Sequence, residues 1–179
     1  MVFPILQPPF TIRVMEPGDA ADVQRSRTHP ENERYNGWRP ETVDEVAAHA
    51  RKQSADTVGR EVGVVQLVIE HDGRFVGDFG VQTVGQPSTI ELGLAVAPEM
   101  KGQGIATRAS AILIAELFRQ GMHRVVARVD PRNEPSLKLF DRLGFRREGH
   151  ERQCYWDDVY GEWTDEVLFA ALRSEWGAP

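Results

Sequence analysis

The chain has 179 residues, of which 41% are hydrophobic, 27% are charged and 8% are aromatic. Such a length and composition are typical of one globular domain with its own core, which needs neither a metal nor a disulfide to hold it. The formal net charge of −6 argues against general binding to nucleic acid, because phosphate backbones are bound by clustered cations. The negative charge is compatible with a cationic substrate such as an amine.

The hydrophobic runs, the cysteine count and the histidine spacing bear on where the protein resides in the cell and on whether it binds a metal. No stretch reaches the ~20 apolar residues that cross a bilayer, and the proline-broken start lacks the basic region of a signal peptide. Cys154 is the single cysteine, which fits a reducing compartment. The five histidines are scattered without metal-ligand spacing. We therefore expect a cytoplasmic protein with no membrane contact and no metal.

The first third of the chain predicts a short strand followed by two helices. Residues 1–10 are expected to form an irregular N-terminal arm, and the alternation in residues 11–15 predicts a strand. A helix is expected from residue 19 to residue 28. Residues 30–40 are polar and rich in turn formers, which predicts a surface loop with at most a helical turn. Apolar residues at helical spacing predict a second helix over residues 41–53.

Three successive strands are expected in the middle of the chain. Residues 62–70 and 75–84 are β-rich, and the turn-forming sequence at residues 71–74 joins them as a hairpin. A turn at residues 86–88 leads to a third strand over residues 89–97. This part of the chain therefore predicts an antiparallel meander.

The last part of the chain alternates helices with strands. A long helix is predicted over residues 103–120 and a short one over residues 133–143, and both end at a glycine. Strands are predicted over residues 123–130, 145–154 and 164–172. The whole order predicts an α/β fold with a mixed, mostly antiparallel sheet of about seven strands, flanked by four helices.

The most informative segment lies where the third strand of the meander meets the long helix. Residues 98–107 read Pro-Glu-Met-Lys-Gly-Gln-Gly-Ile-Ala-Thr. The first amides of a helix lack intrahelical partners and carry the positive end of its dipole, so they form a site for a phosphate. Gly102 and Gly104 would let an anion approach the backbone closely. From the loop alone, a bare glycine turn opening a core helix is the alternative.

Two other phosphate-binding loops do not fit these residues. The nucleoside-triphosphatase loop needs a Lys-Ser/Thr pair after its last glycine, where this chain has Ile105 and Ala106. The dinucleotide-binding fingerprint needs a third glycine at the position of Thr107.

The chain resembles the GNAT superfamily of acyl-CoA N-acetyltransferases, in particular its ribosomal-protein alanine acetyltransferase-like branch. The family signature Gln/Arg-x-x-Gly-x-Gly/Ala resembles Lys101-Gly102-Gln103-Gly104-Ile105-Ala106, with lysine in place of glutamine or arginine. The family's Asn-x-x-Ser segment, helix and Gly-Phe resemble the block from Asn133 to Phe145. Trp163-Thr164-Asp165 resembles the entry to the branch's final strand. The resemblance spans roughly residues 11–176, which we expect to form a single N-acetyltransferase domain.

The resemblance implies a sheet that is splayed between its fourth and fifth strands and that holds acetyl-CoA as co-substrate. In that arrangement the main chain of the fourth strand binds the pantetheine, and one of its amides polarises the acetyl carbonyl. The implied cofactor-binding residues are Leu94, Ala95, Val96, Lys101, Gly102, Gln103, Gly104, Ile105, Ala106, Thr107, Asn133, Ser136 and Phe140.

Two residues are candidates for proton transfer. Glu91 lies in an otherwise apolar strand and is the candidate general base, directly or through water; an edge-facing or substrate-orienting carboxylate is the alternative. Ser136 is the candidate acid for the leaving thiolate, since the later aromatic, Phe140, has no proton to give. Asn133 and Ser136 also suit the start of a helix, where capping alone explains an asparagine.

The resemblance places the loop between the first two helices beside the acceptor cleft, so Tyr35 and Trp38 are candidate substrate-lining residues; core packing is the alternative. The predicted function is acetyl transfer to a primary amine, either a protein N-terminus or a small molecule, by direct attack in a ternary complex. A non-catalytic acyl-CoA sensor and an acyltransferase for a longer acyl chain are the alternatives. Homodimers are frequent in the family, so the resemblance also allows a homodimer.

Overall fold

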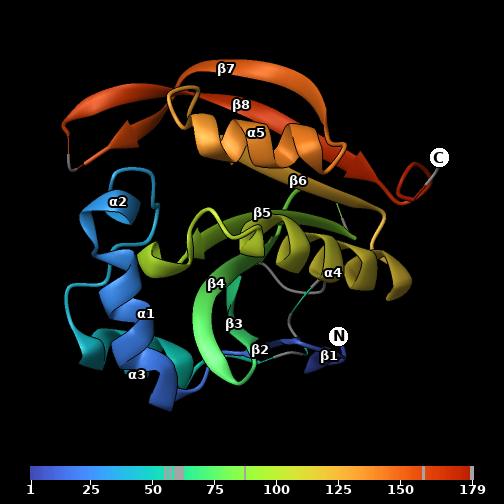
Figure 1. The fold of residues 1–179 in the computed structure, drawn as a ribbon. Coiled ribbons are helices and arrows are strands. Elements are labelled where there is room, and N and C mark those ends of the chain that lie inside the picture. The colour runs from blue at the N-terminus through green and yellow to red at the C-terminus, as the bar shows by residue number, and fades with distance from the viewer. Residues whose placement is uncertain (55, 57, 59–62, 87, 159, 178–179) are drawn as a thin grey trace.

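The computed structural model describes residues 1–177 except residues 55, 57, 59–62, 87 and 159. A single mixed sheet has eight strands in the order β1-β2-β3-β4-β5-β6-β8-β7 (Figure 1). The strands are β1 Ile5–Gln7, β2 Phe10–Val14, β3 Val64–His71, β4 Arg74–Thr83, β5 Thr89–Val96, β6 Arg124–Val129, β7 Arg146–Asp157 and β8 Glu162–Leu172. The helices are α1 Ala20–Arg27, α2 Pro30–Glu33, α3 Val43–Ala50, α4 Ile105–Arg119 and α5 Glu134–Arg142. Within the described residues, no helix is long and apolar enough to span a bilayer.

Helices cover both faces of this sheet, and the strand alternation decides which residues meet them. Val65, Leu67 and Ile69 of β3 belong to the large core that also includes the buried face of α4. Val68, which points to the opposite face, packs in a second cluster with residues of α1 and α3. Figure 1 shows α1, α2 and α3 grouped together, apart from α4 and α5. Each face of β3 and β4 is therefore covered by a different set of helices.

The sheet parts between β5 and β6, as the family resemblance implied. These two strands are parallel, and their pairing ends at Glu91 with Val126. On its other side, β5 stays paired with β4 up to Val96. The backbone of β5 beyond Glu91 is therefore supported from one side only, and a gap opens towards β6. The predicted α/β fold and its splayed sheet are confirmed.

The differences from the sequence-based prediction lie at short elements. Residues 5–7 of the expected irregular arm form β1, which pairs with β2 and makes the eighth strand. The expected loop at residues 30–40 begins with the four-residue α2, which is the helical turn that the prediction allowed there and which makes the fifth α-helix among the described residues. Both are too short for hydrophobic periodicity to indicate them. Val62, the expected start of β3, and Pro87, in the turn before β5, lie outside the described residues.

Candidate active site

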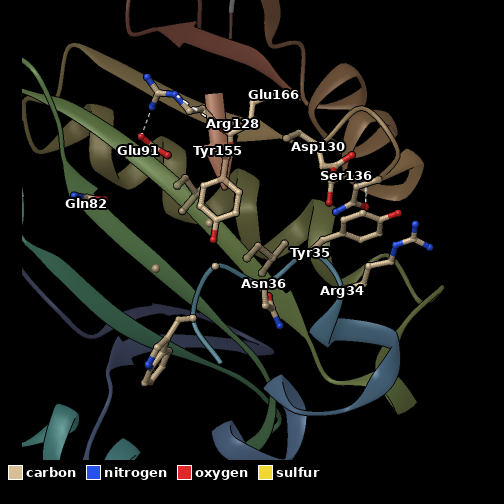
Figure 2. Close-up of a pocket in the computed structure, with 18 of the residues that line it drawn as sticks. Arg34, Tyr35, Asn36, Gln82, Glu91, Arg128, Asp130, Ser136, Tyr155 and Glu166 are labelled. Carbon is tan, nitrogen blue, oxygen red and sulfur yellow. Dashed lines mark hydrogen bonds and ion pairs between the residues drawn. The ribbon is translucent and has the colours of Figure 1, made fainter. Parts of the chain in front are cut away.

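A cavity of about 570 Å³ lies where β5 and β6 separate. The lining comes from both sides of the gap: from β5 on one side, and from β6, α5, β7 and β8 on the other, together with the loop after α2. Val64, Gln66, Gly80 and Gln82 of β3 and β4, with Gly93 of β5, form the floor on the face of the sheet that carries Val68. Figure 2 shows the ring of Tyr155 between Glu91 on one side and Tyr35 and Ser136 on the other. The cavity therefore joins the strand gap to the face of the sheet that α1 and α3 cover.

The structure brings part of the predicted site together around this cavity. The predicted residues that line it are Tyr35, Trp38, Glu91, Leu94, Asn133, Ser136 and Phe140. Ala95 and Val96 continue β5 beyond the lining residues, and the residues from Lys101 to Thr107 form the loop and first turn of α4 that follow. The predicted residues thus lie along one path, which runs from the cavity past the end of β5 to the start of α4.

The start of α4 has the geometry of an anion site. Gly102 and Gly104 both have a φ of +76°, a left-handed conformation that glycine adopts without steric cost. No atom lies within 4 Å of the position that a Cβ would take at either glycine. Gly104 is the N-cap residue, and no side chain caps the helix there. The first amides of α4 are therefore left for a ligand or water, which fits a diphosphate.

Lys101 is held at the edge of this loop by α2. Its Nζ lies 3.3 Å from a carboxylate oxygen of Glu31 and donates to the carbonyl oxygen of the same residue at 3.1 Å. Lysine presents a point charge rather than the planar fork of an arginine. In this structure that charge is partly neutralised by Glu31, next to the open start of α4.

Asn133 and Ser136 combine a structural role with a place in the cavity. The Asn133 side chain accepts a hydrogen bond from the Ser136 amide at 3.3 Å and thereby caps α5. Both residues also line the cavity, next to Phe140, whose ring packs against Phe145 and Phe169. Tyr35 reaches the same corner, where its hydroxyl donates to the Arg132 carbonyl oxygen at 3.2 Å. Capping fixes the first turn of α5 so that Ser136 faces the gap.

The surroundings of Glu91 differ from the expected apolar strand. Its carboxylate forms an ion pair with Arg128 of β6, which Figure 2 shows directly beside it. The alternation of β5 does point Glu91 into the cavity, but a guanidinium from the neighbouring strand meets it there. The sequence gives no sign of this partner because it lies 37 residues away along the chain.

Glu166 of β8 is another carboxylate of the cavity, and sequence reasoning missed it. Burial raises the pKa of Glu166, and the nearby Arg128 guanidinium, 3.9 Å away, only partly offsets that effect. Its position could have been found from the alternation of Thr164, Glu166 and Leu168 in the predicted last strand. A half-buried carboxyl group with a raised pKa is a candidate for exchanging protons with a substrate.

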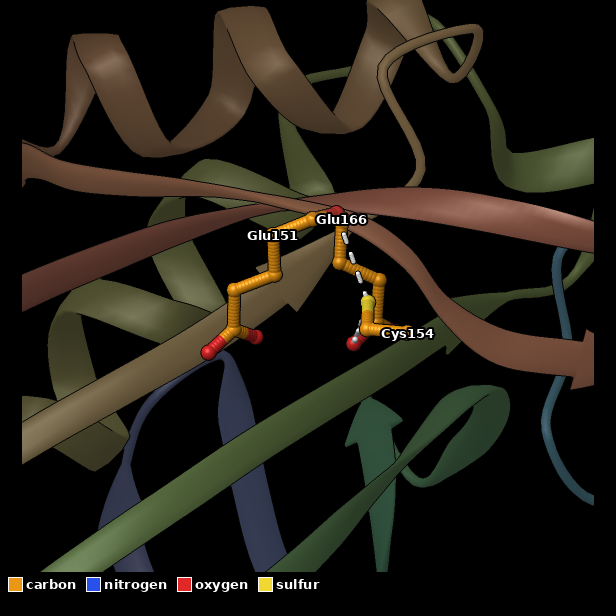
Figure 3. Close-up of side chains that lie close together, drawn as sticks. All are labelled: Glu151, Cys154 and Glu166. Carbon is orange, nitrogen blue, oxygen red and sulfur yellow. Dashed lines mark hydrogen bonds between the residues drawn. The ribbon is translucent and has the colours of Figure 1, made fainter.

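Glu151 and Cys154 of β7 lie close to Glu166, which lines the cavity (Figure 3). The Cys154 thiol contacts a Glu166 oxygen at 3.7 Å, whereas Arg128 contacts Glu151 at 3.1 Å. Burial and the two neighbouring carboxylates raise the pKa of Cys154. The thiol is therefore disfavoured as an anionic nucleophile or metal ligand. The prediction that the protein uses no metal stays a prediction.

A buried ionic network supports the floor of the cavity. Arg27 of α1 pairs with Asp78 of β4, and the Gln66 amide donates to the same Asp78 oxygen. Arg27 and Gln66 both line the cavity although they are only 5% and 2% exposed. Nothing in the sequence pattern indicated this network, since its three members come from separate elements.

The sheet parts between two parallel strands, a cavity lies in the gap, and the uncapped start of α4 lies beyond it. This arrangement suits a cofactor with an extended arm and a diphosphate. Residues 10–146 match the sequence profile described as "Acetyltransferase (GNAT) domain". The chain therefore belongs to the GNAT acetyltransferase family, whose members use acetyl-CoA and transfer acetyl groups to amines.

Relatives share both the sequence and the fold. The chain is 29% identical over 178 residues to a putative ribosomal N-acetyltransferase of Bacillus subtilis, with 93% of each chain covered. It is 31% identical over 102 residues to the ribosomal protein uS5-alanine N-acetyltransferase of Escherichia coli, covering 56% of this chain and 52% of that protein. The structure of Mycobacterium smegmatis RimJ in complex with CoA-disulfide has a TM-score of 0.82 and 27% identity, covering 99% of this chain and 89% of that one.

Proposed function

We propose that this protein transfers the acetyl group of acetyl-CoA to a primary amine by direct attack in a ternary complex. The observation that carries the proposal is the gap between β5 and β6, where strand pairing ends at Glu91 while β5 stays supported by β4. An extended pantetheine arm can pair with the unpaired edge of β5 in that gap. The activity resides in residues 11–176, preceded by the short N-terminal segment.

Along this path each group of residues has one task. The main chain of Leu94, Ala95 and Val96 binds the arm, and one amide stabilises the oxyanion that forms as the amine attacks. The first amides of α4 bind the diphosphate, with Lys101 beside them. Two observations support this assignment: the helix start has no side-chain cap, and both of its glycines face open space.

Proton transfer completes the reaction. The attacking amine must lose a proton because primary amines are mostly protonated at neutral pH. Glu91 accepts that proton, directly or through a water molecule. The second proton, which the nitrogen loses as the amide forms, passes through the Ser136 hydroxyl to the departing sulfur, so Ser136 ends the step protonated. The C–N bond forms as the C–S bond breaks, so the products are an acetamide and CoA. Tyr35 and Trp38 line the side of the cavity from which the amine enters. The acceptor amine is either a protein N-terminus or a small molecule.

Replacing each carboxylate separately tests which of them accepts the proton. Glu91→Gln is expected to lower kcat at least about 100-fold and to leave CoA binding unchanged, because it removes the base without altering the shape of the cavity. Thiol release from acetyl-CoA with a panel of primary amines measures the rate. Glu166→Gln is the matched control on the same Arg128, and its expected effect is less than about tenfold. A larger loss of kcat in Glu166→Gln than in Glu91→Gln would assign the role of general base to Glu166.

Two observations favour the acyl-CoA sensor as the second candidate. The ion pair with Arg128 engages the proposed base, and Phe140 has no proton to give, which leaves Ser136 as the candidate acid on α5. A sensor would bind acetyl-CoA but release no thiol with any amine of the panel, and Glu91→Gln would change nothing. Parallel assays with succinyl-CoA test the preference for a longer acyl chain, which would show as a higher rate with that donor.

A further inference from the structure

Two paired glycines lie on the cavity floor, and neither their backbone conformation nor their packing requires glycine. Gly80 of β4 pairs with Gly93 of β5, and both line the cavity. Neither has a left-handed φ, and a Cβ at either position would meet neighbouring atoms only at ordinary contact distances, 3.5 Å or more. Glycine inside a strand is destabilising relative to alanine and often marks a close approach by a ligand.

Gly77 on the same strand shows the contrast. A Cβ at Gly77 would collide with the carbonyl oxygen of Ala95, so the packing of β4 against β5 itself requires glycine there. Gly80 and Gly93, which we call the glycine strip, have no such requirement. What their missing side chains provide is open space above the sheet, inside the cavity.

The strip belongs to a row that crosses three strands. Gln66 of β3 pairs with Gly80, which pairs with Gly93. The next row on the same face runs from Val64 through Gln82 to Glu91. The glycine strip therefore leads from the proposed base, Glu91 on β5, towards Gln66 on β3 across two strand spacings of about 5 Å each.

The buried network fixes the orientation of the Gln66 amide. A carboxylate accepts hydrogen bonds only, so the Gln66 amide nitrogen must face Asp78, whose oxygen also receives Arg27. The Gln66 carbonyl oxygen is then turned towards the strip, 3.6 Å from the Cβ position of Gly80. Among the described residues no donor reaches this oxygen, and it is not one of the enclosed side-chain atoms without a partner, so it opens to the cavity that Gln66 lines. An oriented acceptor of this kind is available to an N–H or O–H group of a ligand.

We infer that the glycine strip is the subsite for an unbranched segment of the amine substrate, and that the Gln66 carbonyl oxygen accepts a hydrogen bond from a second N–H group of that substrate. The inference rests on the proposed function for the position of the reacting amine. The substrate class is a primary amine with a second N–H donor about one to two strand spacings away along an unbranched chain. A linear diamine and the start of a glycine-rich peptide share this chemistry.

Substitution of the glycines tests the steric part. Gly80→Ala and Gly93→Ala are each expected to raise the KM for pentane-1,5-diamine about tenfold, because a methyl group then occupies the subsite. The KM for acetyl-CoA stays unchanged, and the melting temperature stays the same or rises. Gly149→Ala is the matched control, since Gly149 lies on β7 outside the cavity and also has room for a Cβ. It is expected to change neither KM.

Substitution of Gln66 tests the hydrogen bond. Gln66→Met keeps the length of the side chain and removes the carbonyl oxygen. It is expected to weaken binding of pentane-1,5-diamine to the CoA-bound protein about threefold to tenfold, measured by isothermal titration. Binding of pentylamine, which lacks the second donor, is expected to stay within about twofold. Glycylglycinamide is the peptide probe, and a larger effect on it than on the diamine identifies the peptide as the source.

The outcomes separate this inference from the proposed function. Thiol release that is unaffected by Gly80→Ala, Gly93→Ala and Gln66→Met overturns the subsite and leaves the function standing. If the native protein releases no thiol with any amine, but the three variants still weaken diamine or peptide binding, the function fails and the subsite stands. If neither probe binds the native protein, the subsite is wrong.

Discussion

Arg128 changes the electrostatic surroundings of three carboxylates at the site. Its guanidinium forms an ion pair with Glu91, contacts Glu151 at 3.1 Å and lies 3.9 Å from Glu166. The sequence indicates that Glu91 stands in an apolar strand, but it gives no sign that β6 brings a cation to it. Residue roles at this site therefore depend on strand neighbours, which the order of residues does not reveal.

The contacts of a second arginine, Arg13, predict how the stability of the fold changes at acid pH. Arg13 contacts Asp19 and Glu70 at 2.7 Å each and so ties β2 to the segment before α1. Burial pushes the pKa of Asp19 upwards, but hydrogen bonds from Arg13 and from the Glu16 amide outweigh it, so the pKa of Asp19 is lowered. A lowered pKa means that the ionised carboxylate stabilises the fold above the ordinary carboxyl range. That stabilisation is lost as the pH falls through the lowered value.

Asp19→Asn is therefore expected to cost about 1–3 kcal/mol near neutral pH, and progressively less as the pH falls through the lowered pKa of Asp19. Urea unfolding of the native protein and the variant, from neutral pH down through the acid range, measures the difference. A loss of stability that stays constant as the pH falls would show that shape, rather than charge, makes Asp19 important.

At the scale of elements, long periodic segments were predictable and short ones were not. The meander of β3, β4 and β5 and the helices α4 and α5 follow from alternation, helical spacing and terminal glycines. The strand β1 has three residues and α2 has four, which is too little for any period to show. Their existence depends on tertiary contacts, such as the pairing of β1 with β2.

The start of α4 is the element on which cofactor binding depends most directly. Gly104→Asp is expected to weaken CoA binding at least about tenfold, because it places a negative charge beside the open amides and a side chain on a left-handed residue. Isothermal titration with CoA measures the loss. Gly104→Asn is the control for strain, since asparagine tolerates this conformation and carries no charge.

The charge effect predicts a smaller loss for Gly104→Asn than for Gly104→Asp. Near-native affinity in Gly104→Asp would count against the assigned loop. Equal losses in the two variants would mean that backbone strain, rather than the phosphate charge, explains the result.

At the scale of the whole molecule, the site combines a part that the sequence reveals with a part that it does not. The motif blocks around Gly104 and Asn133 indicate the start of α4 and the part of the cavity built by β5 and α5. Gln66, Tyr155 and Glu166, which also line the cavity, belong to no motif. Those residues meet because β3, β7 and β8 take particular places and registers in the sheet, and non-local pairing of this kind cannot be read from local patterns.

The central claim is that CoA lies in the gap between β5 and β6 with its diphosphate on the start of α4. A crystal structure of the protein soaked with acetyl-CoA tests it most directly. The account predicts diphosphate oxygens within hydrogen-bond distance of the amides between Gly102 and Ala106, and the pantetheine arm along Leu94 to Val96. Bound CoA elsewhere on the molecule, with the gap between β5 and β6 empty, would contradict it.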